Sequence, residues 1–142
     1  MQSTAQHNPV EERERVFLWI KKLTLRIREG DFPVYLIRYS LFKCPWFAVK
    51  LHKIILSDED YFHDHPWSFI SIILKGGYIE HTPERSRLYG AGSILWRPSP
   101  SIHKIQVYQP ATTLVITFKK TRTWGFYTGS GFVKWFDFYK KK

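Results

Sequence analysis

Three histidines stand at spacings that would bring their imidazoles together in a β-protein. His63 and His65 flank Asp64, and His103 follows further along the chain. Residues i and i+2 of a β-strand share one face, so the first two rings should project together from backbone positions roughly 7 Å apart. An imidazole from a neighbouring strand, that of His103, would complete a face of three nitrogens. Such a face suits Fe, Zn, Ni, Cu or Mn better than Ca or Mg, which prefer oxygen ligands.

Glycines and prolines surround the histidines in two spaced patterns. The first is the His-x-His pair, followed by an apolar run at residues 67–74 and by Gly76 and Gly77. The second runs from Gly92 through Pro98 to His103. Both patterns lie in a chain rich in short apolar segments. Together they predict strands that carry the histidines towards one another.

These two patterns resemble the two sequence motifs of the cupin superfamily, whose members are small double-stranded β-helix (jelly-roll) barrels. The first cupin motif also has a glutamate, but Phe69 or Ile70 occupies that position here, and neither side chain can bind a metal. The glycine and asparagine of the second motif are replaced by Pro100 and Val107. The resemblance therefore implies a site of three histidines, similar to the three-His iron sites of cysteine-dioxygenase-like cupins. The His-Asp-His-Pro-Trp phrase is also similar to small cupin-like proteins of bacterial and phage genomes.

Four further side chains near the histidines are candidates for chemistry. Tyr78 and Glu80 share one face of a strand and are the predicted catalytic groups, with Glu80 either replacing the absent carboxylate or hydrogen-bonding a liganding imidazole. Arg97, held extended by Pro98, is the predicted substrate anchor, because a guanidinium grips a carboxylate or phosphate with two parallel bonds. The alternation along residues 95–97 leaves open whether Arg97 faces inward. Asp64 should face away from the two histidines, in a structural or surface role.

Length, composition and charge narrow the class of protein. The 142 residues fit one globular domain, and the 25 aromatic side chains suit strands and a ligand cavity. A net charge of +10 indicates attraction to anions. Cys44 is the only cysteine, so no internal disulfide can form. The chain shows neither a leader-like apolar segment nor an apolar run long enough to span a membrane, and we expect a cytoplasmic protein with no membrane partner.

The pattern along the chain predicts an all-β fold. We expect a flexible segment at residues 1–15 and one cupin-like β-barrel at residues 16–142, with a short N-terminal helix or edge strand. The acidic residues from Glu11 to Glu14 favour a helix start, whereas the alternation from Leu23 to Ile27 favours a strand. Further strands are predicted at residues 34–42, 46–56, 67–74, 78–81, 93–97, 102–108 and 112–118. The aromatic tail from Trp124 to Tyr139 should cap the barrel or supply a dimer interface.

Three functions remain open from the sequence. The favoured one is a mononuclear non-haem enzyme of the oxygenase type, with Fe(II) as the preferred metal and Zn, Ni or Mn as alternatives, acting on a small anionic molecule. The second is a metal-independent isomerase or epimerase of a nucleotide-linked sugar, in which a histidine paired with a buried acid acts as base. The third is a non-catalytic ligand- or nucleic-acid-binding module, disfavoured because the basic residues are dispersed. The cupin resemblance also implies a homodimer.

Overall fold

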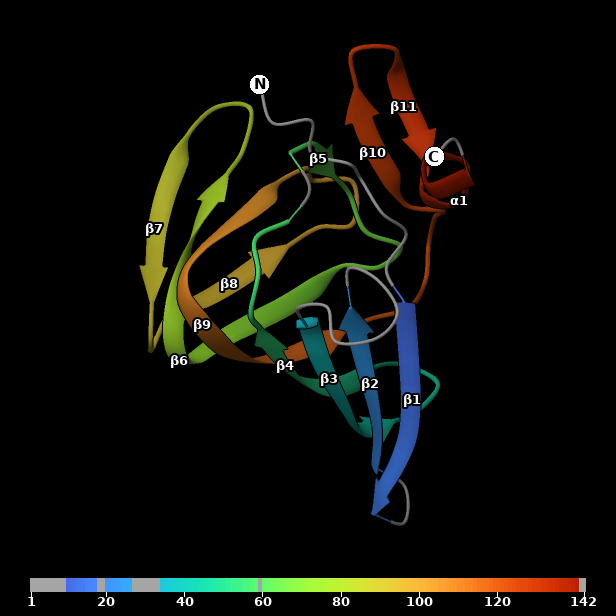
Figure 1. The fold of residues 1–142 in the computed structure, drawn as a ribbon, viewed down its shortest axis with the longest axis vertical. Helices are drawn as coiled ribbons and strands as arrows, with labels where there is room; N and C mark the ends of the chain where they lie inside the picture. Colours follow the sequence, from blue (N-terminus) through green and yellow to red (C-terminus); the bar gives the residue numbers. More distant parts are fainter. Residues whose placement is uncertain (1–9, 18–19, 27–33, 59, 141–142) are drawn as a thin grey trace.

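Antiparallel strands make up nearly all of the regular secondary structure (Figure 1). The computed structural model describes residues 10–17, 20–26, 34–58 and 60–140. One six-residue helix, α1, lies near the C-terminus, and no helix in the described ranges is long and apolar enough to cross a membrane. The elements are β1 (Val10–Phe17), β2 (Ile20–Arg26), β3 (Val34–Lys43), β4 (Ala48–Ile54), β5 (Phe62–His63), β6 (Phe69–His81), β7 (Ser86–Gly90), β8 (Ile94–Arg97), β9 (Lys104–Thr117), β10 (Gly125–Thr128), β11 (Gly131–Lys134) and α1 (Trp135–Lys140).

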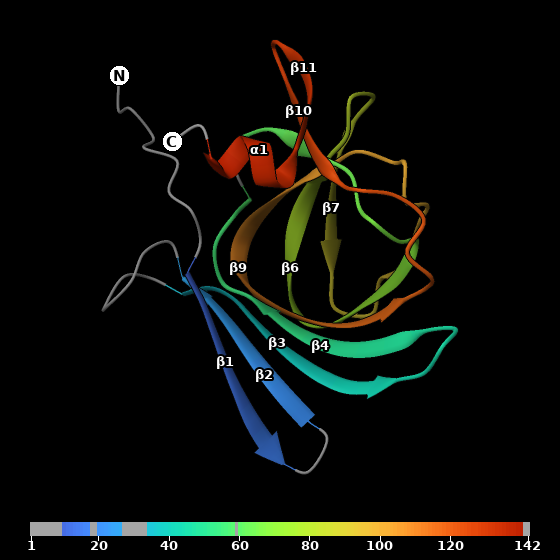
Figure 2. The ribbon, with the colours of Figure 1, turned by 90° about the vertical axis from the view of Figure 1, so that its right-hand side faces the viewer.

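Two sheets form an all-β jelly-roll barrel, which confirms the predicted fold class. The larger sheet has eight strands in the order β1-β2-β3-β4-β9-β6-β7, with β8 paired to the first half of β6 on the same edge as β7. The smaller sheet has the order β11-β10-β5. Figure 2 shows β6 and β9 curving around the barrel while the β10–β11 hairpin and α1 lie across one end. This end contains the three histidines.

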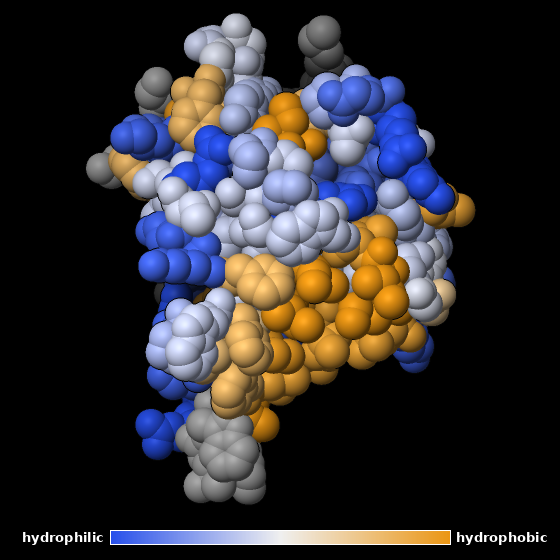
Figure 3. Space-filling model, turned by 180° about the vertical axis from the view of Figure 1, so that it is seen from behind, coloured by the Kyte–Doolittle hydropathy of each residue, from blue (hydrophilic) through white to orange (hydrophobic). Residues whose placement is uncertain are grey.

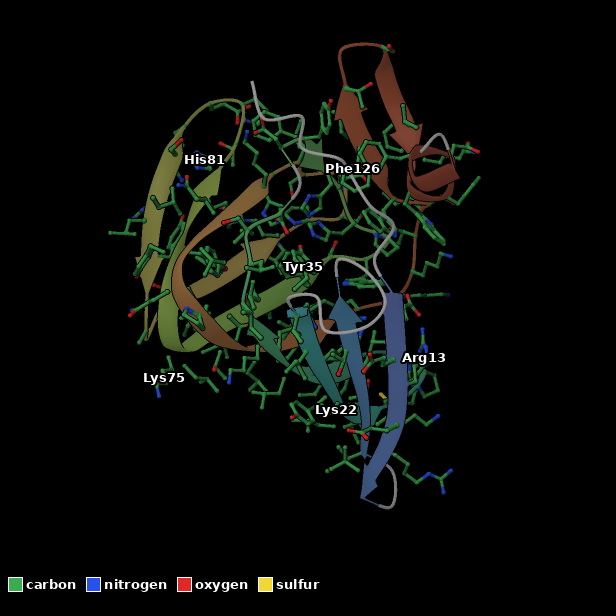
Figure 4. All side chains as sticks on the ribbon, in the orientation of Figure 1. Arg13, Lys22, Tyr35, Lys75, His81 and Phe126 are labelled. Carbon is green, nitrogen blue, oxygen red and sulfur yellow. The ribbon has the colours of Figure 1, made fainter. Side chains whose placement is uncertain are left out.

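Strands β6 and β9 are long because each continues through a bend. The sequence predicted separate strands at residues 67–74 and 78–81, on either side of Gly76 and Gly77, and this break is wrong: β6 runs unbroken, with register shifts against β9 between Ile73 and Tyr78. Gly76 has a φ of +72°, and a Cβ there would lie 2.0 Å from the carbonyl oxygen of Pro110. Only glycine fits this bulge, which bends the sheet without ending the strand. Lys75, beside it, points away from the barrel (Figure 4).

The inner faces of the strands form the core. Ile73 and Ala111 are fully buried, and Tyr78, Leu95 and Ile105 pack against them with less than a tenth of their surface exposed. These residues come from β6, β8 and β9 and alternate with outward-facing neighbours, as expected for strands with one buried face. Tyr78 therefore lies in the apolar interior of the barrel.

The N-terminal segment forms a hairpin rather than a helix. The predicted helix start at Glu11 is wrong, because β1 pairs with β2 in an antiparallel ladder from Val10 onwards. The edge-strand alternative is the one observed. One ion pair crosses the ladder, between Glu14 and Lys22, whose carboxylate and ammonium lie 3.2 Å apart. Strand β1 thus begins before the expected domain boundary at residue 16, and residues 1–9 lie outside the described ranges.

The outer face of the larger sheet is apolar over five adjacent strands. Two rows of residues lie directly opposite one another across β8, β6, β9, β4 and β3, and neither row contains a charged side chain. Figure 3 shows a broad hydrophobic area on this side of the molecule. Ile94 is 70% exposed and Trp96 is 53% exposed. The rows are Trp96, Ile70, Ile116, Val49 and Phe42, and Ile94, Ile72, Leu114, Leu51 and Tyr39.

Candidate metal centre

The structure brings the three predicted histidines together. One ring nitrogen from each of His63, His65 and His103 lies within 4.8 Å of the others. The ring centroids are 5.0 Å apart for His63–His65 and His63–His103, and 4.8 Å apart for His65–His103. The rings meet edge to face, so their nitrogens surround a common point. Among the residues that the structure describes, this is the one group of three such side chains suited to holding a metal ion.

Backbone hydrogen bonds fix the ribbon that carries His63 and His65. His63 and His103 exchange two bonds, with N–H to O distances of 2.9 and 3.0 Å. The N–H of His65 donates to the carbonyl of Ser99 on the same side. The N–H of Asp64, between them, donates to Gly125 on the opposite side. The N–H groups of residues 63–65 therefore alternate in direction, as they do in an extended chain. Because residues two positions apart on such a chain share one face, both imidazoles lie on the side of His103.

Burial keeps two of the rings neutral. It disfavours the charged ring and so lowers the pKa of His63 to about 4, although the nearby carboxylate of Asp58 acts in the other direction. Burial, together with the neighbouring rings of His103 and His63, places the pKa of His65 well below its ordinary value. The Nδ1 atom of His65 is buried and has no hydrogen-bond partner among the described residues. Neutral, converging imidazoles with an unsatisfied nitrogen fit a transition metal ion.

Glu80 holds the third histidine. Its carboxylate lies 2.6 Å from Nδ1 of His103, and both side chains are buried. Arg97 donates to the same carboxylate through Nε at 2.9 Å and Nη2 at 2.5 Å. These three residues form one chain of hydrogen bonds from β8 through β6 to His103. Sequence reasoning offered two roles for Glu80, and the structure places it against a histidine ring.

The Glu80 carboxyl is ionised in this arrangement. Burial alone would raise its pKa, but the hydrogen bonds from His103 and Arg97 outweigh burial and lower the pKa to about 2. An ionised carboxylate only accepts hydrogen bonds, so the proton between the two groups belongs to Nδ1 of His103. In the neutral form of the ring, the other nitrogen, Nε2, would carry a free lone pair. This is the tautomer in which a histidine binds metal with a carboxylate behind it.

Two other predicted site residues, Arg97 and Tyr78, hydrogen-bond to neighbouring side chains of the protein. Arg97 faces inward, but its bonds to Glu80 engage the groups that would grip a substrate, and they raise the pKa of the guanidinium. Burial, partly offset by a hydrogen bond to Ser71, raises the pKa of Tyr78 to about 12, so its hydroxyl stays protonated. Whether Tyr78 and Glu80 take part in catalysis, and whether Arg97 contacts substrate, stay predictions.

Asp64 ties the histidine ribbon to the C-terminal segment. It is fully buried, and it accepts a hydrogen bond from the N–H of Gly125 at 2.8 Å. Arg122 lies 2.7 Å from its other oxygen, and the Tyr127 hydroxyl donates to that oxygen as well. Burial raises the pKa of the Asp64 carboxyl, although its partners act in the other direction. Asp64 thus faces away from the histidines, as expected for a structural residue.

Aromatic rings cover the same end of the barrel. The ring of Phe126 lies 6.0 Å from that of His63 and stacks on Phe138 of α1 at 4.0 Å. Trp124 lies 6.1 Å from His63. Figure 4 shows Phe126 beneath β10, beside α1. The tail therefore contributes to a dry wall beside His63, in line with the capping role that the sequence suggested for it.

Asp58 is a neighbour of the site that the sequence did not reveal. Its carboxylate lies 4.0 Å from Nε2 of His63 and accepts hydrogen bonds from the Tyr35 hydroxyl and from the N–H of Ile105. It also borders a hollow of about 310 Å³ on the side of the barrel. In the sequence it stands in a polar segment that is typical of a surface turn, and no spacing links it to a histidine.

Comparison with known proteins identifies the fold. No family model matches the chain, and no curated protein matches its sequence. Among solved structures, a cupin-2 domain protein of Rhodospirillum rubrum is 13% identical with a TM-score of 0.64, over 87% of this chain and 85% of that one. The polyketide cyclase RemF of Streptomyces resistomycificus is 17% identical with a TM-score of 0.57, over 77% and 82%. A cupin superfamily protein of Desulfitobacterium hafniense is 16% identical with a TM-score of 0.51, over 58% and 76%.

At these identities the similarity concerns the fold. The chain has a cupin-type barrel, which confirms the expectation drawn from the two histidine patterns. The three-His cluster at one end of that barrel makes it a candidate divalent metal centre.

Proposed function

We propose that this protein binds one divalent transition metal ion through His63, His65 and His103, and that it acts as an Fe(II)-dependent oxygenase on a small anionic molecule. The observation that carries the proposal is the meeting of three imidazoles, two partly buried and one, His103, buried and backed by the Glu80 carboxylate. Three nitrogen ligands would leave an octahedral ion with open positions for substrate and dioxygen, and the ion would supply Lewis acidity and redox chemistry there.

The charge of the site supports an anionic substrate. All three ligands would be neutral, so they would offset none of the two positive charges of the ion. Glu80 compensates in part, but its own charge is shared with Arg97. A carboxylate or phosphate on the substrate would restore neutrality in a partly buried site, where an uncompensated charge is costly.

The surrounding residues would orient the ligands and exclude water. Glu80 holds the proton at Nδ1 of His103 and so presents the other nitrogen. The rings of Phe126 and Trp124 shield His63 on one side, and the ring of Phe69 lies 4.7 Å from that of His65. A dry wall of this kind strengthens electrostatic interactions at the site.

Elemental analysis of the purified protein tests the proposal. We expect about one equivalent of a transition metal per chain, with Fe(II) the expected ion under anaerobic purification, and its loss in His103→Ala. His81→Ala is the matched control, because His81 bonds to Ser86 and Gln106 away from the cluster. Metal content that is equal in both variants would contradict the proposal.

One observation favours a second function, a metal-independent isomerase or epimerase. Such an enzyme needs a histidine base with a buried acid in hydrogen-bond reach, and His103 with Glu80 meets that requirement at 2.6 Å. The fold is also similar to that of RemF, a polyketide cyclase. Turnover of a nucleotide-linked sugar by exhaustively chelated protein would establish this function, and loss of turnover on chelation would exclude it.

A further inference from the structure

Basic side chains line one inner wall of the barrel, on β3 and β4. Arg38 on β3 lies directly opposite His52 on β4. Lys50 is also on β4, two positions before His52, so its side chain lies on the same face. On the next strand, His52 is opposite Thr113 and Lys50 is opposite Val115. Thr113 and Val115 are 1% and 6% exposed, so this is the face that looks into the barrel.

Within the described part of the chain, no carboxylate lies within ion-pair distance of either cation, and Glu11 acts on Arg38 only at longer range. The Nε–H of Arg38 donates to Nε2 of His52 at 2.9 Å, which leaves the two Nη groups of its guanidinium without a hydrogen bond among the described residues. The ammonium of Lys50 lies 4.4 Å from the ring centroid of Trp67, two positions after His65. No ion pair in the described part of the chain includes Arg38 or Lys50.

Unsatisfied polar atoms lie in the same interior. The Thr113 hydroxyl is buried and has no hydrogen-bond partner among the described residues, and it is opposite His52. The buried Nδ1 of His65 also lacks one. A buried polar group without a partner is costly, so groups of this kind mark places where a ligand supplies the missing bond.

We infer that Arg38 and Lys50 form an anion-binding subsite that holds the carboxylate or phosphate of the molecule that reacts at the histidine cluster. The inference rests on the proposed function for the identity of that reaction. An anionic oxygen group would accept parallel hydrogen bonds from the free side of the Arg38 guanidinium and a charged bond from Lys50. A hydroxyl or carbonyl of the same molecule would satisfy Thr113.

Electrostatics agree with this geometry. Burial, followed by the positive charges of Arg38 and Lys43, lowers the pKa of Lys50 to about 8. Burial likewise lowers the pKa of Arg38. Two partly buried cations of like charge destabilise each other, and a bound anion would relieve both. Arg97, the anchor predicted from the sequence, cannot serve in the same way because Glu80 already occupies its donors.

Anion titrations of charge-neutralised variants test the inference. Inorganic phosphate and acetate would be titrated separately at low ionic strength, with binding followed by calorimetry or by NMR shifts. The variants are Arg38→Gln and Lys50→Gln. Lys53→Gln is the matched control, because Lys53 lies on β4, is exposed and faces the outer side. We expect saturable binding of at least one anion, weakened about 10-fold or more in each inner-wall variant and unchanged in the control.

The phosphate and acetate titrations are each carried out on protein as purified and on protein after chelation. Metal content is measured in every variant. Phosphate binding alone would assign a phosphorylated substrate, and acetate binding alone a carboxylate. Absence of saturable binding to the parent chain, or equal affinity in Lys50→Gln and Lys53→Gln, would overturn the inference. Metal content separates the failure of the metal-site proposal from the failure of the anion-subsite inference. Loss of anion binding with full metal content would contradict only the subsite. Anion binding by a chain that holds no metal would contradict only the metal site.

Discussion

Glu80 determines how His103 is presented to the centre of the site. It fixes the position of the ring proton, and Arg97 in turn holds the carboxylate. In Glu80→Gln an amide replaces the ionised group, so the ring loses its charged partner and can rotate or change tautomer. We expect metal affinity to fall roughly 10- to 100-fold, as measured by competition with a chromophoric chelator.

Glu84→Gln provides the control for that measurement, since Glu84 is exposed in the segment between β6 and β7. Equal metal affinity in Glu80→Gln and Glu84→Gln would show that Glu80 does not orient the ligand.

The buried histidines predict a stability that depends on pH. Burial lowers the pKa of His52 and His65 well below 6.5, and that of His63 to about 4. Each ring takes up its proton near pH 6.5 in the unfolded chain, so the unfolded state binds more protons between the two pKa values. The free energy of unfolding is therefore highest above pH 6.5 and decreases towards pH 4, by up to about 1.4 kcal/mol per pH unit for each ring.

Urea unfolding of metal-free protein across this range measures the effect. His52→Gln removes one of the rings without touching the cluster and should reduce the slope. A free energy of unfolding that stays constant between about pH 6.5 and pH 5 would contradict the prediction.

Single residues also show what sequence could and could not predict about the site. The spacing of His63 and His65 and the position of His103 were sufficient to predict that the rings meet, because alternation along a strand fixes which side chains share a face. The facing of Arg97 could not be predicted, since Leu95 and Arg97 face inward only once β8 is paired with β6. The basic inner wall was missed for the same reason, because Arg38 and Lys50 come together only through the register of β3 and β4.

Among the elements, the C-terminal cap has the clearest energetic role. Phe138 of α1 is 7% exposed, stacks on Phe126 and meets the ring of Tyr61 edge to face. In Phe138→Ala we expect the free energy of unfolding to fall by about 3 kcal/mol, as measured by urea denaturation. Metal retention should weaken too, because the wall beside His63 loosens.

Phe132→Ala is the comparison variant, because Phe132 on β11 is 41% exposed and should cost clearly less stability. Equal losses in the two variants would show that α1 does not cover the barrel.

The positions of strands were predictable from the sequence where polar and apolar side chains alternate. They were less predictable where a glycine bulge or the pairing with another strand determines where a strand ends. Residues 34–42 and 46–56 were expected as strands and correspond to β3 and β4. The unbroken course of β6 and β9 was missed, because the bulge at Gly76 depends on the close approach of Pro110 from another strand. The acids of β1 suggested a helix, but the antiparallel ladder to β2 pairs the backbone of this segment and brings Glu14 opposite Lys22.

For the molecule as a whole, the apolar outer face of the larger sheet is the most prominent surface feature. Its five strands span roughly 20 Å across the sheet at about 4.8 Å per strand, and the two central rows carry no charge. Monomers rarely leave so broad an apolar surface exposed. We propose that a second copy of the chain covers it, since two copies of this face can pair about a two-fold axis with their uncharged rows in contact.

Trp96→Lys tests this assembly. The substitution places a charge on the β8 side of the proposed contact, and we expect a dimer of the parent chain to become a monomer in sedimentation equilibrium. Leu88→Lys is the control, because Leu88 is 63% exposed on β7, away from the two rows. A monomeric parent chain, or a Trp96→Lys variant that remains dimeric, would contradict the prediction.

The two-way backbone bridge between His63 and His103, with β10 paired on the other side of His63, has a consequence for biosynthesis. Ribosomes deliver the chain from its N-terminus, so His63 and His65 emerge well before His103, and β10 emerges after all three. The cluster therefore cannot assemble before β10 has been synthesised. Binding of the proposed metal ion would follow that point, and translation products that end before Gly125 would lack the strand that pairs with His63.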